Sequence, residues 1–445
     1  MTLLKDNLNE STTFATSNWA LSNKLLFRFF FIYLVLQMSG VWLTIIPYSY
    51  YITQYYFKLT DLLVIVANDS FFHVKKVLAA PAGSDTSYAW ANVWLYISLA
   101  LIGCVVWSFL DRKRSNYQRL NYWLCLFVRY YIALTAFNYG IIKIFSLQMP
   151  FPSQSQLATP LGDFLPMRLC WMFMGYSTPY QLFTGIMETF VGFLLLYRKT
   201  TTLGVFLALF VFINVMMLNI SYDIPVKLFS MNVVVACLYL LVNEYDRMMC
   251  FFVLDKHANT NKIYHYAYSK KWMRILRIGL KIVFFILIVA SQFYDSWDRY
   301  KTIVNQPETK PIKSGIYDVA VYAVNKDTLL PLLTDSLRWQ NVIFDGNGIG
   351  SIKTADTSFR QRYQRGYFAF STDTIKQIIN FTKWQTDSTM YNGVILSMHY
   401  KLIDNNTIQL WGKEKNDSLY VLLKRSNRHF QLAEKQFHWL SEYNR

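Results

Sequence analysis

The sequence predicts a membrane protein of two parts: a bundle of about seven transmembrane helices and, after it, an antiparallel β-barrel or β-sandwich domain. Three observations predict this fold class. Charged residues are only 16% of the chain, against roughly 25% in soluble domains, and hydrophobic residues are 53%. The apolar residues gather in runs of spanning length. After about residue 300, short alternating runs replace the long ones.

Seven runs approach the roughly 20 apolar residues that a helix needs to cross a bilayer. They cover 25–47, 90–110, 121–146, 176–197, 202–220, 226–243 and 273–294. The first run is too long for a signal peptide and predicts an uncleaved anchor helix. The apolar stretch 62–66 is too short to span, and predicts an interfacial or re-entrant piece. Four prolines in 147–175 predict an irregular loop.

The net charge of +17 comes largely from basic clusters beside the apolar runs, which indicates membrane orientation and excludes nucleic acid as a partner. The clusters fall in 111–120, 198–201 and 244–272, while 48–89, 147–175 and 221–225 carry few net positive charges. The positive-inside rule therefore predicts a cytoplasmic N-terminus in a bacterial inner membrane. Seven spans then place the C-terminal domain in the periplasm.

These boundaries predict four regions. Residues 1–120 hold the N-terminal tail and two transmembrane helices, 121–243 a four-helix core, 244–300 a cytoplasmic loop and the last transmembrane helix, and 301–445 the β-rich domain. In the last region about eight strands are separated by turn residues, and 429–440 is predicted as one of the strands. Such a barrel either holds a small ligand or is a packed docking module. Its histidines lack metal-ligand spacing, and no histidine lies in a predicted span, so neither a metal nor a haem is expected.

Polar residues inside the spans are the candidate ligand-binding residues, because polar groups are costly in hydrocarbon. They are Arg129, Tyr131, Asn138, Lys143, Glu188, Asn214, Asn219, Asp223 and Lys227. Counting residues from the cytoplasmic side places Arg129 and Glu188 at similar depths, about 12–13 Å. This predicts an ion pair between them, with Asn214 near the same layer. The pair either holds helices together or forms a substrate or quinone site.

A second polar layer is predicted near the outer face. There Asp223 would pair with Lys143 or Lys227, either as snorkelling interfacial residues or as a polar mouth for a headgroup or quinone ring.

Three segments resemble the DoxX-like family of membrane proteins. They are RYYIALTAFNYGIIK at 129–143, MGYSTPYQLFTGIMETFVGFLLLYRKT at 174–200, and NVMMLNISYDIPVKLFSMNVVVACLY at 214–239. The resemblance implies a four-helix core and a quinone-linked redox or electron-transfer subunit, with quinone as the cofactor. The helix layout is more distantly similar to the membrane domains of vitamin K-dependent carboxylases.

Two further functions stay open at this point. The first is a non-enzymatic accessory or anchor subunit of an envelope complex, which docks a periplasmic protein partner through 305–445. The second is a small-molecule transporter, which the paired intramembrane charges permit although no inverted repeat is evident. The sequence holds no redox cysteine pair and no nucleotide motif, so any redox work would need a bound quinone or a partner subunit.

Overall fold

In the computed structural model the chain forms two compact units. The first comprises 1–148 and 179–297, and the second comprises 149–178 and 298–445. The structure describes residues 18–45, 48–81, 83, 85–256, 270–305, 311–332, 338–346, 348–383, 393–414, 416–434, 438–440 and 442. The segment 149–178, most of which falls in the predicted loop 147–175, thus belongs with the C-terminal domain.

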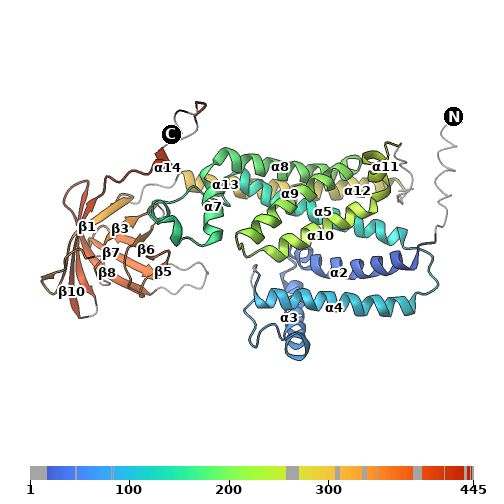
Figure 1. Cartoon of the computed structure of the whole chain (residues 1–445), viewed down its shortest axis with the longest axis horizontal. Coiled ribbons are helices and arrows are strands. Elements are labelled where there is room, and N and C mark those ends of the chain that lie inside the picture. Colours follow the sequence, from blue (N-terminus) through green and yellow to red (C-terminus); the bar gives the residue numbers. More distant parts are fainter. Residues whose placement is uncertain are drawn as a thin grey trace. The chain divides into compact units, whose positions relative to one another are not determined.

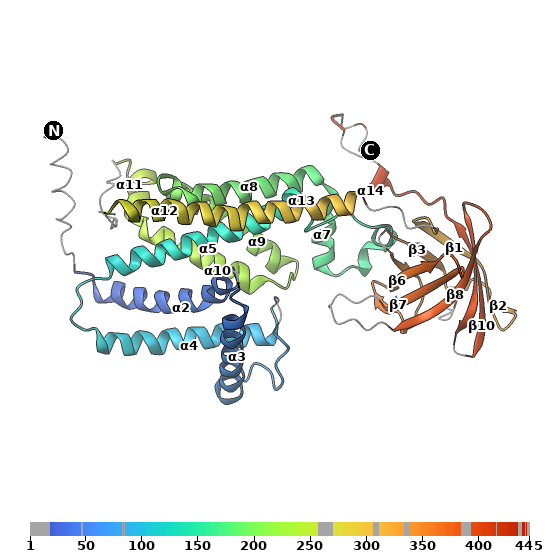
Figure 2. The same ribbon diagram turned by 180° about the vertical axis from the view of Figure 1, so that it is seen from behind.

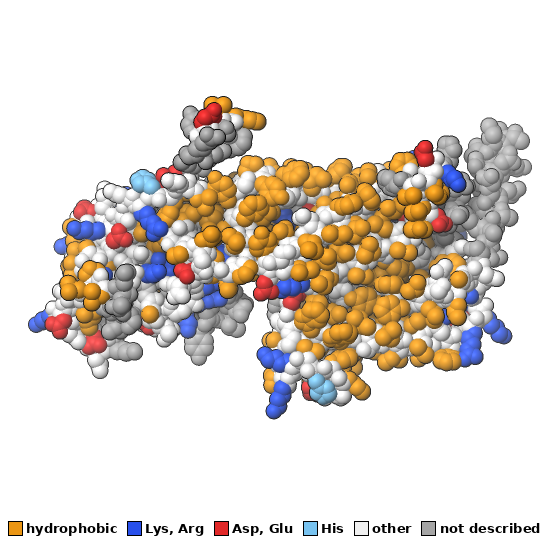
Figure 3. All heavy atoms as spheres, viewed as in Figure 1, with side chains coloured by type: hydrophobic (Ala, Val, Ile, Leu, Met, Phe, Trp, Pro, Cys, Tyr) orange, Lys and Arg blue, Asp and Glu red, His pale blue; other side chains and the backbone are white. Residues whose placement is uncertain are grey.

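The first unit is a helix bundle (Figure 1). Its helices are α2 (Leu21–Ile45), α3 (Tyr50–Ala67), the π-helical η1 (Asn68–Phe72), α4 (Ser87–Leu110), α5 (Gln118–Ile144), α8 (Thr178–Leu196), η3 (Arg198–Thr200), α9 (Thr201–Ser221), α10 (Lys227–Asn243), α11 (Tyr245–Phe252), α12 (Lys271–Phe284), the π-helical η5 (Phe285–Ala290) and the first half of α13 (Ser291–Val304). Hydrophobic side chains cover most of its visible surface (Figure 3).

Among the described residues, five helical segments are long and apolar enough to cross a membrane: α2, α4, α5, α8 and η3 with α9. Helices α10 and α11 make a sixth if they count as one span, although they are bent by 71° relative to each other. The predicted span 273–294 is not among them. There the helical segments are α12, η5 and α13, and α12 is only 14 residues long and carries basic residues.

The long helices alternate in direction. Arg28 near the start of α2 donates to Ser108 near the end of α4, and Asn121 near the start of α5 donates to Asn243 at the end of α10. The segment from α12 to α13 instead runs parallel to α5. Phe284 packs on Tyr130 with 4.9 Å between ring centroids, and Phe293 packs on Phe145, fifteen residues further along α5, at 5.0 Å.

Helix α3 stands across α2 and α4 (Figure 2). Tyr56 and Ser39 of α2 share a hydrogen bond of 2.9 Å, and Asp61 accepts one from Tyr88 of α4. The outward residues of α3 are largely apolar or aromatic, among them Tyr51, Tyr55, Leu59, Leu62 and Val66. This arrangement fits the interfacial alternative for 62–66, because aromatic and apolar side chains on one face suit a helix lying along a membrane surface.

The second unit is a closed antiparallel β-barrel. Its strands are β1 (Gly315–Val324), β2 (Asp327–Thr328), β3 (Asn341–Phe344), β4 (Ile349–Ile352), β5 (Arg360–Arg362), β6 (Arg365–Asp373), β7 (Ile378–Lys383), β8 (Val394–Leu402), β9 (Thr407–Glu414) and β10 (Asp417–Arg425). Eight of them follow one another around the barrel, and β10 pairs with β1 to close it, with β2 and β5 as short additions. The predicted barrel is confirmed, and the sandwich alternative is wrong.

The barrel is filled by side chains. Trp339, Phe344, Phe368, Phe381 and Met398 are at most 2% exposed and belong to one hydrophobic cluster. A barrel of eight strands is just wide enough for its own side chains to fill. The packing therefore favours the docking-module alternative over a ligand held inside.

Three short strands, β2, β4 and β5, were not predicted, and one predicted strand is wrong. The strand β4 was missed because it has only four residues and directly follows a turn. The strand predicted at 429–440 is wrong in its described part, where Gln431–Glu434 forms the short helix α14. Pairing of β10 with β1 leaves no open edge for a further strand there.

The segment 149–178 packs on the barrel within the second unit. It contains α6 (Gln154–Leu157), the 3-10 helix η2 (Leu161–Asp163) and α7 (Pro166–Tyr176). Asp345 after β3 accepts hydrogen bonds from the Ser155 amide at 3.1 Å and the Ser153 hydroxyl at 3.3 Å. Ser351 donates to Ser155, and Arg365 donates to Ser351, both at 2.7 Å. The α5–α8 connection is thus fixed to the barrel by a buried polar network.

Candidate functional site

An ion pair is buried in the helix bundle between Lys143 near the end of α5 and Glu188 in the middle of α8. Lys143 is 5% exposed and Glu188 is 2% exposed. Taking two charges out of water is costly, and their attraction repays this only with good geometry and further hydrogen bonds. A charged pair at this depth among apolar helices is therefore a candidate functional site by default.

Close contact between the two helix backbones positions the pair. A Cβ added at Gly140 of α5 would lie 2.8 Å from the Gly185 carbonyl oxygen, and one at Gly185 would lie 2.7 Å from the Gly140 carbonyl oxygen. Small residues let helix backbones approach in this way. Lys143 and Glu188 each lie three residues beyond one of these glycines, so the glycine crossing brings their side chains together.

The predicted pair between Arg129 and Glu188 is wrong. Arg129 donates to the Thr201 hydroxyl at 3.2 Å and lies over the Tyr130 ring, with 5.3 Å from its guanidinium carbon to the ring centroid. The prediction counted depth from the cytoplasmic ends of the predicted spans 121–146 and 176–197, and it assumed that these two ends lie at the same depth. Helix α5 instead begins at Gln118 and extends past the α8–α9 turn. Arg129 therefore lies level with the start of α9.

One oxygen of the buried carboxylate has no partner. Among the described atoms, Glu188 Oε2 is fully buried without a hydrogen bond, and so is the hydroxyl of the next residue, Thr189. Leaving a buried polar atom unpaired costs about 1–3 kcal/mol, and more for a charged group. The site thus offers an acceptor on Glu188 and the ammonium donors of Lys143 to a small polar group.

The second predicted layer is confirmed in part. Of the two partners predicted for Asp223, the structure selects Lys227, with 2.7 Å between Lys227 Nζ and Asp223 Oδ1. The Asp223 side chain is 80% exposed, so this pair is a surface feature. Asn219 is buried and donates to the Val226 carbonyl at 3.4 Å, which holds the turn between α9 and α10.

The remaining candidates lie apart from the buried pair. Asn214 is exposed on α9, so its side chain does not join the buried pair, and its depth near the layer of Glu188 stays a prediction. Tyr131 is buried in the hydrophobic cluster of the bundle, and Asn138 is half-buried. Of the nine predicted residues, the structure brings together two pairs, Lys143 with Glu188 and Asp223 with Lys227.

Two polar side chains that link helices of the bundle by hydrogen bonds, Arg28 and Asp85, are not predicted from the sequence. Arg28 of α2 is 2% exposed and donates to the Tyr117 hydroxyl at 2.8 Å, the Ser108 hydroxyl at 2.7 Å and the Asp111 carbonyl at 3.1 Å. Asp85 accepts hydrogen bonds from the first two amides of α10, those of Lys227 and Leu228, at 2.6 and 3.1 Å. An arginine inside an apolar run was the available signal for the first. Nothing in the sequence indicates the second, because Asp85 lies about 140 residues away.

Among the described residues, no group of three or more His, Cys, Asp and Glu side chains is placed to hold a metal ion. No family model matches the chain. No solved structure matches it. A curated relative, the uncharacterized protein YwoB of Bacillus subtilis (strain 168), is 31% identical over 124 residues, which are 28% of this chain and 79% of YwoB. The chain therefore belongs to the same protein family as YwoB.

Proposed function

We propose that the protein is a multi-pass inner-membrane protein that binds the polar head of a lipid-soluble molecule, of the quinone class, at Lys143 and Glu188. The observation that carries the proposal is the buried, unpartnered Oε2 of Glu188 beside the Lys143 ammonium. A purely structural ion pair gains most when its remaining lone pairs are satisfied. A ligand that donates to Glu188 supplies the missing hydrogen bond.

Quinones suit these two side chains chemically. A quinone carbonyl accepts a hydrogen bond, which the Lys143 ammonium provides, and a quinol hydroxyl donates one, which Glu188 accepts. The apolar helix surfaces around the pair suit an isoprenoid tail. The resemblance of 129–143 and 174–200 to the DoxX-like family supports the same class, and extends it to a quinone-linked redox or electron-transfer subunit.

The proposal includes seven membrane crossings, with the basic end of the helix bundle in the cytoplasm. The basic residues Arg112, Lys113, Arg114, Arg198 and Lys199 all lie at the end of the bundle where α4 and α8 end. The positive-inside rule makes that end cytoplasmic. The segment from α12 to α13 runs parallel to α5, so it crosses in the same direction as α5.

The same reasoning supports a periplasmic barrel. The chain leaves α5 at its end opposite the basic clusters and enters 149–178, which packs on the barrel through Ser155 and Asp345. A segment packed on a domain lies on the same side of the membrane as that domain. The barrel then shares the side of the α5–α8 connection, which is the periplasmic side in this orientation.

Quinone binding by the purified full-length protein tests the proposal. The protein is solubilised in detergent, its lipids are extracted, and menaquinone is quantified per protein; the empty protein is then titrated with menaquinone. We expect retained quinone in the wild type and binding at least about tenfold weaker in Glu188→Gln, since one charge-assisted hydrogen bond is worth about 1.5–3 kcal/mol. The matched control is Asn214→Ala, an outward-facing polar residue of the same bundle.

The proposal fails if the wild type binds no menaquinone, or if Glu188→Gln binds it as the wild type does.

The barrel supports a second function, as the docking module of an accessory subunit. Its interior is filled, and its buried network holds 149–178 in place, so a rigid outer surface is what it offers to a partner. A photo-crosslinking residue placed at exposed Val394 or Trp411 of the full chain tests this in cells. Because 149–178 completes the barrel unit, the full chain is the sample to use. Recovery of the same envelope protein from both positions supports docking, and recovery of none contradicts it.

A further inference from the structure

One outer face of the barrel carries aromatic rings on three neighbouring strands. His399 of β8 pairs in register with Trp411 of β9, and Trp411 pairs with Tyr420 of β10. Side chains on directly paired residues point to the same face of a sheet. The three rings therefore form one row across the strands, on the outside of a barrel whose inside is already packed.

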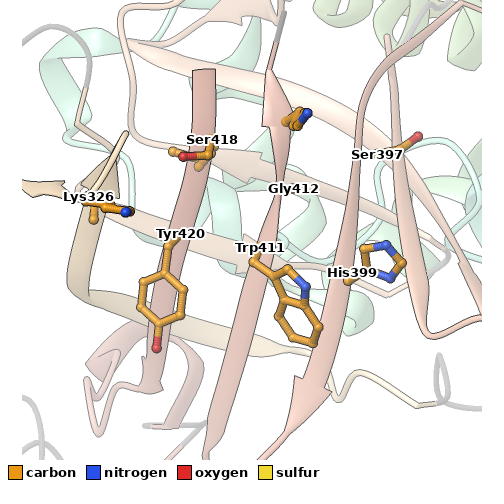
Figure 4. Close-up of a pocket in the computed structure, with 10 residues that line it drawn as sticks. Lys326, Ser397, His399, Trp411, Gly412, Ser418 and Tyr420 are labelled. Atoms are coloured by element: carbon orange, nitrogen blue, oxygen red, sulfur yellow. The ribbon is translucent and has the colours of Figure 1, made fainter. Parts of the chain in front are cut away.

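The three rings lie side by side on neighbouring strands (Figure 4). The His399 and Trp411 rings are 5.7 Å apart between centroids and inclined by only 20°, and Trp411 is 37% exposed. The Tyr420 hydroxyl accepts a hydrogen bond of 3.1 Å from Gln409, which fixes the third ring. The row thus presents the nearly parallel His399 and Trp411 rings and the hydrogen-bonded Tyr420 ring at the spacing of adjacent strands.

A shallow depression of about 790 Å³ lies over the row, and its rim is polar and basic. Ser397, Ser418, Lys413 and Lys326 line it, and the described lining residues include no acidic side chain. The position of Lys326 is informative. It occupies the two-residue turn between β1 and β2 with a φ of 78°, a left-handed conformation that such turns usually fill with glycine. Lys326 adopts this conformation despite its cost, and it brings a positive charge to the rim.

We propose that this face binds an acidic saccharide. Aromatic faces carry partial negative charge and attract the polarised C–H groups on the flat side of a sugar ring. The serine hydroxyls supply hydrogen bonds to sugar hydroxyls, and the two lysines attract a carboxylate. A peptide added as an extra strand does not fit, because β10 pairs with β1 and the closed barrel leaves no open edge here.

Calorimetric titration of the detergent-solubilised full chain with a mannuronate tetrasaccharide tests the proposal. Cellotetraose, which is uncharged, separates stacking from charge recognition. We expect binding of the acidic tetrasaccharide to weaken about tenfold in Trp411→Ala and to be largely kept in Trp411→Phe. The double variant Lys326→Ala/Lys413→Ala should lower affinity for the acidic sugar toward that for cellotetraose, and added salt should weaken wild-type binding.

Trp439→Ala is the matched control, because this tryptophan is 92% exposed and lies outside the row. Melting temperatures of all variants show whether the barrel is intact. The proposal is overturned if neither saccharide binds, or if Trp411→Ala binds like Trp439→Ala in a folded barrel. Equal or tighter binding of a proline-rich peptide or a single-stranded oligonucleotide, with the same dependence on Trp411, also overturns it.

Discussion

The two units each bury a basic side chain near a carboxylate, Lys143 beside Glu188 in the bundle and Arg365 near Asp345 in the barrel. In the barrel, both charged side chains form hydrogen bonds with surrounding groups. Arg365 donates to Ser351 and Asn341 at 2.7 Å, and Asp345 accepts from the segment 149–178. In the bundle, Glu188 Oε2 has no hydrogen-bond partner among the described atoms.

The difference separates two uses of buried charge. A network whose members are all hydrogen-bonded rigidifies a structure, whereas an unsatisfied buried group is expensive and calls for another explanation. We therefore interpret the barrel network as the fastening of 149–178, and the bundle pair as a site that a ligand completes.

The largest effect is expected from Lys143→Met. This change leaves Glu188 buried without its counter-charge, which destabilises by about 3–5 kcal/mol. The loss should appear as a lower melting temperature of the bundle in detergent. The double variant Lys143→Met/Glu188→Leu should recover most of it, because two apolar residues replace the pair. Asp223→Asn, which breaks the pair with Lys227 at its exposed partner, should cost less than about 1 kcal/mol. A Lys143→Met bundle as stable as the wild type would contradict the ion pair.

Arg365→Met should destabilise the barrel by about 2–3 kcal/mol, because Ser351 and Asn341 lose a charged donor. It should also loosen 149–178, since Ser351 bonds Ser155. Limited proteolysis of the full chain reads out both effects, with faster cleavage in 149–178 expected. The control is Arg362→Met on β5, whose guanidinium lies over the Tyr363 ring. Equal proteolysis of the two variants would show that the network does not fasten the segment.

Asp85→Ala should cost about 1 kcal/mol, the usual value for removing a cap from a helix N-terminus. Asp85 accepts from two amides of α10, so the loss should fall on the bundle alone. The measurement is the melting temperature of the bundle, with Asp223→Ala as control. If both variants melt alike, Asp85 does not cap α10.

The smallest effect concerns pH. Burial raises the pKa of Asp345 above its ordinary value of 3.8, although hydrogen bonds from Ser155 and Ser153 and the charge of Arg365 oppose the rise. Between the ordinary and the raised pKa the folded state binds more protons than the unfolded state. Its contribution to stability therefore grows as pH falls through that window and is lost as pH rises. The melting temperature of the wild type should therefore fall relative to that of Asp345→Asn as pH rises from 4 to 7. A constant difference from pH 4 to 7 would contradict the shift, with exposed Asp327→Asn as control.

Much of the fold was predictable because its signals are local. Alternating residues predict strands such as β1 and β9, and long apolar runs predict α2 and α4. The partner of Glu188 was not predictable, because it depends on where each helix begins relative to its neighbours. The Gly140–Gly185 crossing sets that offset, and its effect exists only once the helices pack. The same holds for Asp85 and for Asp345, whose partners are remote in sequence.

The central claim is that a ligand completes the Glu188 site. An experimental density map of the full-length protein in lipid nanodiscs containing menaquinone tests this most directly. The account predicts density for a quinone head within hydrogen-bonding distance of Glu188 Oε2 or Lys143 Nζ, and its loss in Glu188→Gln. Clear density for both side chains, with Oε2 bonded to a group of the chain itself and no ligand beside it, would contradict the account.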